Sequence, residues 1–168
     1  MNMTQSRDAM TERAGVRSDI AVREAVPGDA EALAVLLAQM DDEPSETEGF
    51  NAALTRQIMA DMESYPDFKA YLALDEAGVP VGTFSLMVFC SLSHHGSRQA
   101  LLDAVVVSRE RRGEGVGEAM LQRALHIAAG SGCYKLSLSS NIKRKDAHRF
   151  YERLGFSQHG VSFGIELA

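Results

Sequence analysis

A glycine-rich turn between a buried strand and a helix constrains this fold more than any other stretch. Three β-branched residues, Val105, Val106 and Val107, are typical of a strand covered on both faces. The glycines that follow remove a side chain at every second position, so another molecule can approach the backbone closely. The next helix directs its first N–H groups and its positive dipole end outward, which makes an anion site. We therefore predict a phosphate-binding turn, formed by Gly113, Gly115 and Gly117.

The spacing of this turn excludes two common nucleotide sites. It lacks the Lys-Ser/Thr pair of a P-loop and the glycine spacing of a dinucleotide fingerprint. The pattern Arg112-x-x-Gly115-x-Gly117 instead resembles R/Q-x-x-G-x-G/A, the pyrophosphate-binding signature of the GNAT family (GCN5-related N-acetyltransferases). In that family the turn holds the diphosphate of acetyl-coenzyme A. From the residues alone, a turn that binds no ligand stays open as an alternative.

A second motif spans residues 141–156, about 25 residues downstream. It resembles the family pattern N-x(n)-A-x-x-F-Y-x-x-x-G-F. Ala147 is small where the cofactor passes the helix, and Phe150 and Phe156 bury that helix. In the family the tyrosine at Tyr151 protonates the departing thiolate as a general acid. A half-buried core tyrosine is the alternative. Residues 141–158 also resemble the matching segment of bacterial aminoalkylphosphonate N-acetyltransferases.

The resemblance implies a mixed αβ GNAT fold: a twisted mixed sheet of about six to seven strands with about four helices, splayed at its central strands. Main-chain groups of Val105 and Val107 would then pair with pantetheine. Arg111 and Arg112 would add charge to the turn. The basic residues Lys143, Arg144 and Lys145 would face the adenosine 3′-phosphate, although solvated side chains explain all of these cations equally well. The cofactor residues implied are Val105, Val106, Val107, Arg112, Gly113, Glu114, Gly115, Val116, Gly117, Glu118, Asn141, Ala147, Phe150 and Tyr151.

An amine must lose a proton before it attacks a thioester, so a base is expected. Alignment on the valine run places Asp103 where several relatives carry a glutamate base. Aspartate is one carbon shorter, which favours a water relay. A purely structural Asp103 is the alternative, and His94 and His95 are other candidates because imidazole titrates near neutral pH. A metal at this histidine pair lacks a third ligand by spacing, so no metal is predicted.

Taken in order, the chain predicts a flexible tail over residues 1–18 and one domain over 19–168. Met1, Met3 and Met10 leave the start site open. Asp29 is a candidate N-cap. Strands are expected at 20–25, 69–74, 79–90, 100–107, 134–139 and 161–167, and helices at 30–40, 50–64, 116–130 and 146–154.

Composition limits the partners and the compartment. A net charge of −6 argues against nucleic acid, and no apolar run reaches the ~20 residues of a membrane span. Cys90 and Cys133 are expected to be buried, reduced thiols, which suits the cytoplasm. The resemblance also allows a homodimer.

We expect an acyltransferase that passes the acetyl group of acetyl-CoA to a small primary amine by direct attack in a ternary complex. An aminoalkylphosphonate would need cations, and a polyamine-like amine would need carboxylates. Acetylation of a protein N-terminus or lysine, or a non-catalytic acyl-CoA-binding module, are the alternatives. The candidate cations are Arg56, Arg98 and His94, and the candidate carboxylates are Asp41, Asp42, Glu43, Glu46 and Glu48.

Overall fold

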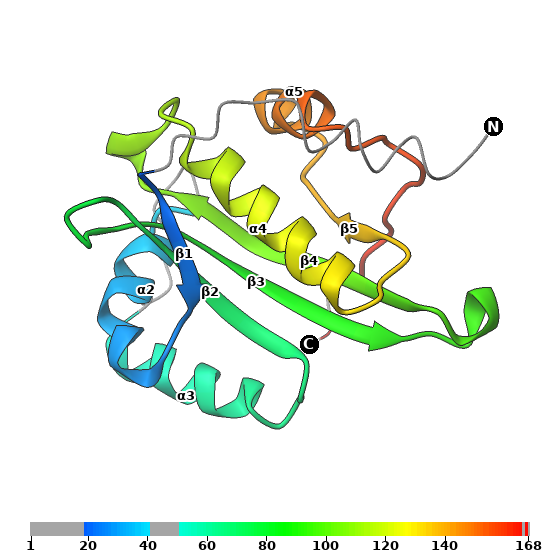
Figure 1. Ribbon diagram of the computed structural model, residues 1–168, viewed down its shortest axis with the longest axis horizontal. Coiled ribbons are helices and arrows are strands. Elements are labelled where there is room, and N and C mark those ends of the chain that lie inside the picture. The colour runs from blue at the N-terminus through cyan, green and yellow to red at the C-terminus, as the bar shows by residue number, and fades with distance from the viewer. Residues whose placement is uncertain (1–18, 41–50, 166, 168) are drawn as a thin grey trace.

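The computed structural model describes residues 19–40, 51–165 and 167, which form one five-stranded mixed sheet (Figure 1). The strands lie in the order β1-β2-β3-β4-β5. Neighbours from β1 to β4 are antiparallel, whereas β5 runs parallel to β4. The strands are β1 (Ala21–Glu24), β2 (Phe68–Leu74), β3 (Pro80–Cys90), β4 (Arg98–Val107) and β5 (Leu136–Leu138).

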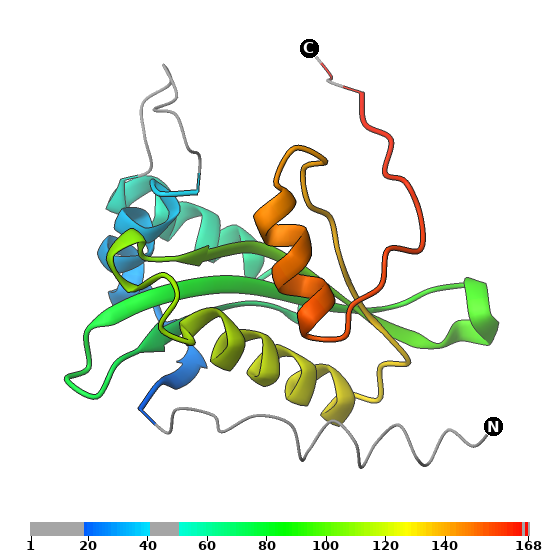
Figure 2. The same ribbon diagram turned by 90° about the horizontal axis from the view of Figure 1, so that it is seen from above.

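Helices cover both faces of this sheet. Figure 2 shows α2 and α3 on one face and α4 on the other, with α5 following β5. Three short 3-10 turns precede α2, join β3 to β4, and follow β4: η1 (Pro27–Asp29), η2 (Ser93–Gly96) and η3 (Arg109–Arg111). The helices are α2 (Ala30–Leu37), α3 (Ala52–Met62), α4 (Val116–Gly130) and α5 (Lys145–Arg153).

The core is divided by the sheet, as the period-two pattern of β2 requires. Tyr71 and Ala73 belong to the large buried cluster beneath α4, while Leu72 packs with the helix α2 on the opposite face. Gly82 on β3 allows α4 to lie close, because a Cβ there would be 2.5 Å from the Met120 Sδ. The core therefore fixes α4 directly against β3.

Among the described residues, the predicted mixed fold and four helices are confirmed, but the strand number is not. The sheet has five strands rather than six to seven. The expected final strand over 161–167 is wrong, since no regular element follows α5 in the described residues. Its apolar alternation is real, but residues 161–165 and 167 pair with no strand of the described sheet. The predicted tail, 1–18, lies outside the described residues.

Two local predictions also need correction. Asp29 is the N-cap residue of α2, but its side chain makes no capping hydrogen bond to that helix. Its carboxylate instead accepts the Val26 N–H at 2.8 Å and two N–H groups of Arg23 at 2.7 and 2.8 Å. The hydrogen bond from Arg23 lowers the pKa of Asp29. Cys90 is exposed and Cys133 half-buried, so neither is fully buried, and both are free thiols. Across the described residues, no helix combines the length and apolarity needed to cross a membrane.

Candidate active site

The glycine turn has the backbone conformation that only glycine adopts easily. Gly113 and Gly115 have φ values of 81° and 86°, in the left-handed region, and open space surrounds both. Gly115 is the N-cap of α4, and no side chain caps the first N–H groups of that helix. These N–H groups are therefore available to an anion.

Gly117 makes a close packing contact that the sequence analysis did not predict. A Cβ at this position would lie 3.0 Å from Cζ of Phe150 and 3.5 Å from Cγ2 of Val107. The missing side chain thus lets α5 pack on the first turn of α4. The two sequence motifs meet at this contact, which the spacing of the glycines alone could not reveal.

The arginines beside the turn are mostly engaged within the protein. Arg111 forms ion pairs with Asp75 at 2.8 Å and Glu114 at 2.7 Å, which raise its pKa and tie the turn to the β2–β3 hairpin. Arg111 is therefore not free to add charge to a bound diphosphate. Arg112 is exposed, and its Nε donates to the Val107 carbonyl at 3.4 Å.

A bulge distorts β4 directly before the valine run. Thr83 pairs with Val106 and Ser85 with Asp103, so two residues of β4 face the single residue between them on β3. Ala104 takes a φ of 49°, a conformation that costs a non-glycine residue about 1–2 kcal/mol. Since alanine gives no sequence signal for this conformation, the bulge could not be predicted.

The sheet opens just past this bulge. β4 and β5 pair only from Ala100↔Leu136 to Leu102↔Leu138. Beyond Leu102 the strands separate, as the resemblance implied. A cavity of about 440 Å³ lies at this opening, lined by Met40, Leu102, Asp103, Ala104, Val105, Leu138, Ser139, Ser140, Asn141, Lys143, Arg144 and Tyr151.

The two predicted catalytic residues line this one cavity from different elements. Asp103 lies exposed on β4, where its backbone carbonyl accepts a hydrogen bond from Ser85 Oγ at 3.3 Å. Tyr151 is half-buried on α5, with the rings of Phe150 and Phe156 edge-on at 5.3 and 5.8 Å. Burial raises the pKa of Tyr151, and the positive charge of Arg144 partly opposes this rise. The phenol therefore stays protonated at neutral pH.

The loop from β5 to α5 is organised by Asn141. Its Oδ1 accepts the Lys143 N–H at 2.9 Å, and its carbonyl accepts the Arg144 N–H at 2.9 Å and lies 3.0 Å from the His148 Nε2. The Asn141 Oδ1, which was predicted to bind the pantetheine arm, therefore already accepts a hydrogen bond within the protein. The sequence analysis did not identify His148 as a residue that positions this loop. The motif drew attention only to the preceding residue, Ala147.

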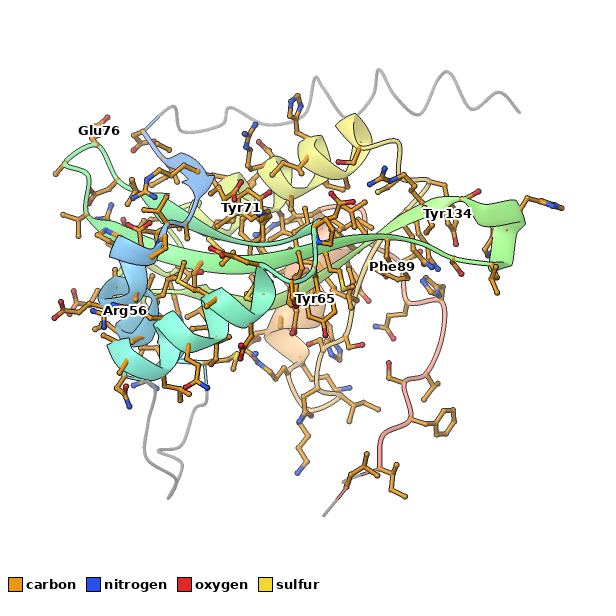
Figure 3. The ribbon with its side chains drawn as sticks, turned by 90° about the horizontal axis from the view of Figure 1, so that it is seen from below. Arg56, Tyr65, Tyr71, Glu76, Phe89 and Tyr134 are labelled. Carbon is orange, nitrogen blue, oxygen red and sulfur yellow. The ribbon has the colours of Figure 1, made fainter. Side chains whose placement is uncertain are left out.

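Several sequence candidates lie away from the cavity. His94 and His95 occupy η2 at the tip of the β3–β4 hairpin (Figure 1), where His94 packs 4.9 Å from the Tyr134 ring. Arg98 is paired with Asp67 at 2.8 Å. Arg56 lies on α3. Figure 3 shows it at the opposite end of the molecule from Tyr134, the residue that packs against His94.

Of the predicted cofactor residues, Val105, Asn141 and Tyr151 line the cavity. Val106 is only 3% exposed, and the Phe150 ring packs against the core cluster. No group of three or more His, Cys, Asp or Glu residues in the described ranges could hold a metal ion. The predicted acidic residues between 41 and 50 lie outside those ranges.

The family model for the acetyltransferase (GNAT) family matches residues 34–156. This chain belongs to the GNAT family. An aminoalkylphosphonate N-acetyltransferase of Salmonella typhimurium is 29% identical over 92% of the chain and 96% of its own length. A glucosamine 6-phosphate N-acetyltransferase of Trypanosoma brucei brucei is 34% identical over 52% of the chain, which spans 57% of that relative. The GNAT fold is also that of a transcriptional regulator from Bacillus halodurans C-125, with a TM-score of 0.80 at 24% identity over 88% and 99% of the two chains.

As a GNAT member, the protein is an acyltransferase that acts on amines with acetyl-CoA as co-substrate. The residues present fit that co-substrate in two respects. The uncapped N-terminus of α4 suits a diphosphate, and the open edge of β4 near Val105 leaves backbone groups for a pantetheine arm.

Proposed function

We propose that this GNAT enzyme acetylates the primary amine of a small molecule that also carries a phosphonate or phosphate group. The single observation that carries the proposal is the opening between β4 and β5, because it brings Asp103 and Tyr151 to one cavity. A carboxylate and a protonated phenol beside one space are the base and the acid that amine acetylation requires.

The two residues have complementary tasks. An ammonium has no lone pair, so the exposed carboxylate of Asp103 accepts a proton from the ammonium group through a water molecule, which leaves the neutral amine. The co-substrate supplies the acetyl thioester, and the amine attacks it directly in a ternary complex. The phenol of Tyr151 then donates its proton to the departing thiolate. The Val105 N–H, at the open edge, would stabilise the negative charge on the attacked carbonyl oxygen.

The charge around the cavity favours an anionic acceptor. Lys143 and Arg144 line it and come from the β5–α5 loop. The relatives from Salmonella typhimurium and Trypanosoma brucei brucei are named for an aminoalkylphosphonate and for glucosamine 6-phosphate, and each acceptor joins an amine to a phosphorus oxyanion. A phosphonate or phosphate group of the acceptor would form charge-assisted hydrogen bonds with Lys143 and Arg144.

The test is a screen for coenzyme A release with 2-aminoethylphosphonate, glucosamine 6-phosphate, spermidine and a lysine peptide. We expect kcat/KM to be at least 100-fold higher for one of the two phosphorus compounds. Replacing Lys143 and Arg144 together by Gln should raise KM for that compound, with Lys135→Gln as the control. Turnover of spermidine or the peptide alone would overturn the proposal.

A further inference from the structure

An acidic side chain stands inside the predicted phosphate-binding turn. Glu114 lies between Gly113 and Gly115, the two glycines with left-handed backbone, and it directly precedes the N-cap of α4. Among the described residues, no side-chain hydrogen bond caps this helix. A carboxylate is itself an anion that the N-terminus of a helix attracts. Glu114 is therefore placed along the chain to compete with a diphosphate for the same N–H groups.

Arg111 holds this carboxylate away from the helix. Its Nε donates to the Glu114 Oε2 at 2.7 Å, and its Nη1 donates to the Asp75 Oδ2 at 2.8 Å. One guanidinium thus joins the turn to the β2–β3 hairpin. Asp75 is only 15% exposed, so solvent and salt screen this anchor less than they screen a fully exposed ion pair.

The anchor is itself fixed by the backbone of the hairpin. The Asp75 Oδ1 accepts the Ala77 N–H at 3.0 Å and the Val79 N–H at 2.9 Å. The hydrogen bond from Val79, followed by that from Arg111, lowers the pKa of Asp75. Asp75 is therefore ionised at neutral pH and offers Arg111 a partner in a fixed position.

We propose that Arg111 is a positioning residue for the co-substrate. By holding the Glu114 carboxylate toward Asp75, it keeps the N–H groups at the start of α4 open to the diphosphate of coenzyme A. Arg111 does not touch the diphosphate and acts only through Glu114. Without Arg111, the Glu114 carboxylate would be uncompensated and free to turn to the helix, where it would repel and displace the diphosphate.

This inference rests on the N-terminus of α4 as the coenzyme site and not on the acceptor amine proposed above. Its readout is therefore the affinity for coenzyme A rather than the turnover of an amine. An acceptor screen that fails leaves the affinity measurement interpretable, and the reverse also holds.

The test is isothermal titration calorimetry of the full chain with coenzyme A. Arg111→Gln should raise the Kd for coenzyme A at least tenfold. The double variant Arg111→Gln/Glu114→Gln should restore the Kd to within twofold of the unmodified protein, because the competing carboxylate is gone. Arg98→Gln is the matched control, since it breaks a similar ion pair, with Asp67 at 2.8 Å, at the other end of β4. It should leave the Kd unchanged.

The double variant separates positioning from a merely structural role. The bridge from Arg111 to Asp75 stays broken in both variants, so both should lose a similar amount of thermal stability while only Arg111→Gln loses affinity. If Arg111→Gln does not fold, Arg111→Lys replaces it in both variants, because one ammonium cannot reproduce the two-sided geometry of a guanidinium. A Kd that stays unchanged without Arg111, or that Glu114→Gln does not restore, would overturn the proposal.

Discussion

The ring of Phe150 occupies the space that a side chain on Gly117 would need, with 3.0 Å between the Phe150 Cζ and the missing Cβ. This contact seats α5 on the first turn of α4. Since Tyr151 is the next residue, the same contact sets the position of the phenol at the cavity. The predicted phosphate-binding turn and the proposed acid are thus linked by direct packing.

Gly117→Ala should therefore damage both stability and activity. The added methyl group overpacks a tight contact, and we expect a loss of about 1–3 kcal/mol in the free energy of unfolding. Urea denaturation and kcat measure the two effects. Gly130→Ala in the same helix is the control, because its Cβ would meet nothing within 4 Å. A Gly117→Ala variant as stable and active as that control would contradict the linkage.

Tyr151→Phe should lower kcat by about 100-fold or more, as expected when a general acid is removed. The KM for acetyl-CoA should change little, because the ring remains in place. Tyr134→Phe, an exposed tyrosine near the hairpin tip, should behave as the unmodified enzyme. Unchanged turnover in Tyr151→Phe would remove the phenol from the mechanism.

The alkaline limb of the pH profile should report the same phenol. Burial raises the pKa of Tyr151, and Arg144 lowers it. Activity that needs the protonated phenol should thus persist to about pH 10 or above. Arg144→Gln removes the opposing charge, so the limb should move further upward. The absorbance of tyrosinate, taken as the difference from Tyr151→Phe, gives an independent measure. A downward move would contradict the assigned electrostatics.

Acid should weaken the fold partly through Asp29. Its folded pKa lies below its ordinary value of 3.8 because Arg23 hydrogen-bonds to the carboxylate. The stabilisation is therefore complete above the ordinary value and is lost as pH falls through the lowered folded value. The difference in Tm between the protein and Asp29→Asn should shrink below pH 4. Asp61→Asn on α3 is the control, and a difference independent of pH would contradict the prediction.

Much of the fold could be predicted because local patterns and tertiary contacts agree. The expected strand over 79–90 and helix over 116–130 match β3 and α4. In both segments the spacing of the apolar residues and the glycines at the ends predict the same element. The GNAT signature likewise predicted a turn at Gly115 and a helix at Tyr151, and the structure has α4 beginning after Gly115 and α5 containing Tyr151. These features are encoded by residues close together in the sequence.

The remaining features depend on contacts between distant segments. The bulge at Ala104 arises from the register with β3. An alanine in the sequence does not predict the positive φ that this residue adopts. The ion pair of Arg111 with Asp75 needs the β2–β3 hairpin beside the turn. The pattern over 161–167 predicts a strand, but the described residues of this segment pair with no other strand.

A crystal structure with coenzyme A bound tests the central claim most directly: the opening between β4 and β5 is the site of acetyl transfer. We expect the diphosphate on the N–H groups at the start of α4, beside Gly115, and the sulfur in the cavity between Val105 and the phenol of Tyr151. A coenzyme bound elsewhere, or a sulfur beyond hydrogen-bonding reach of that phenol, would contradict the account.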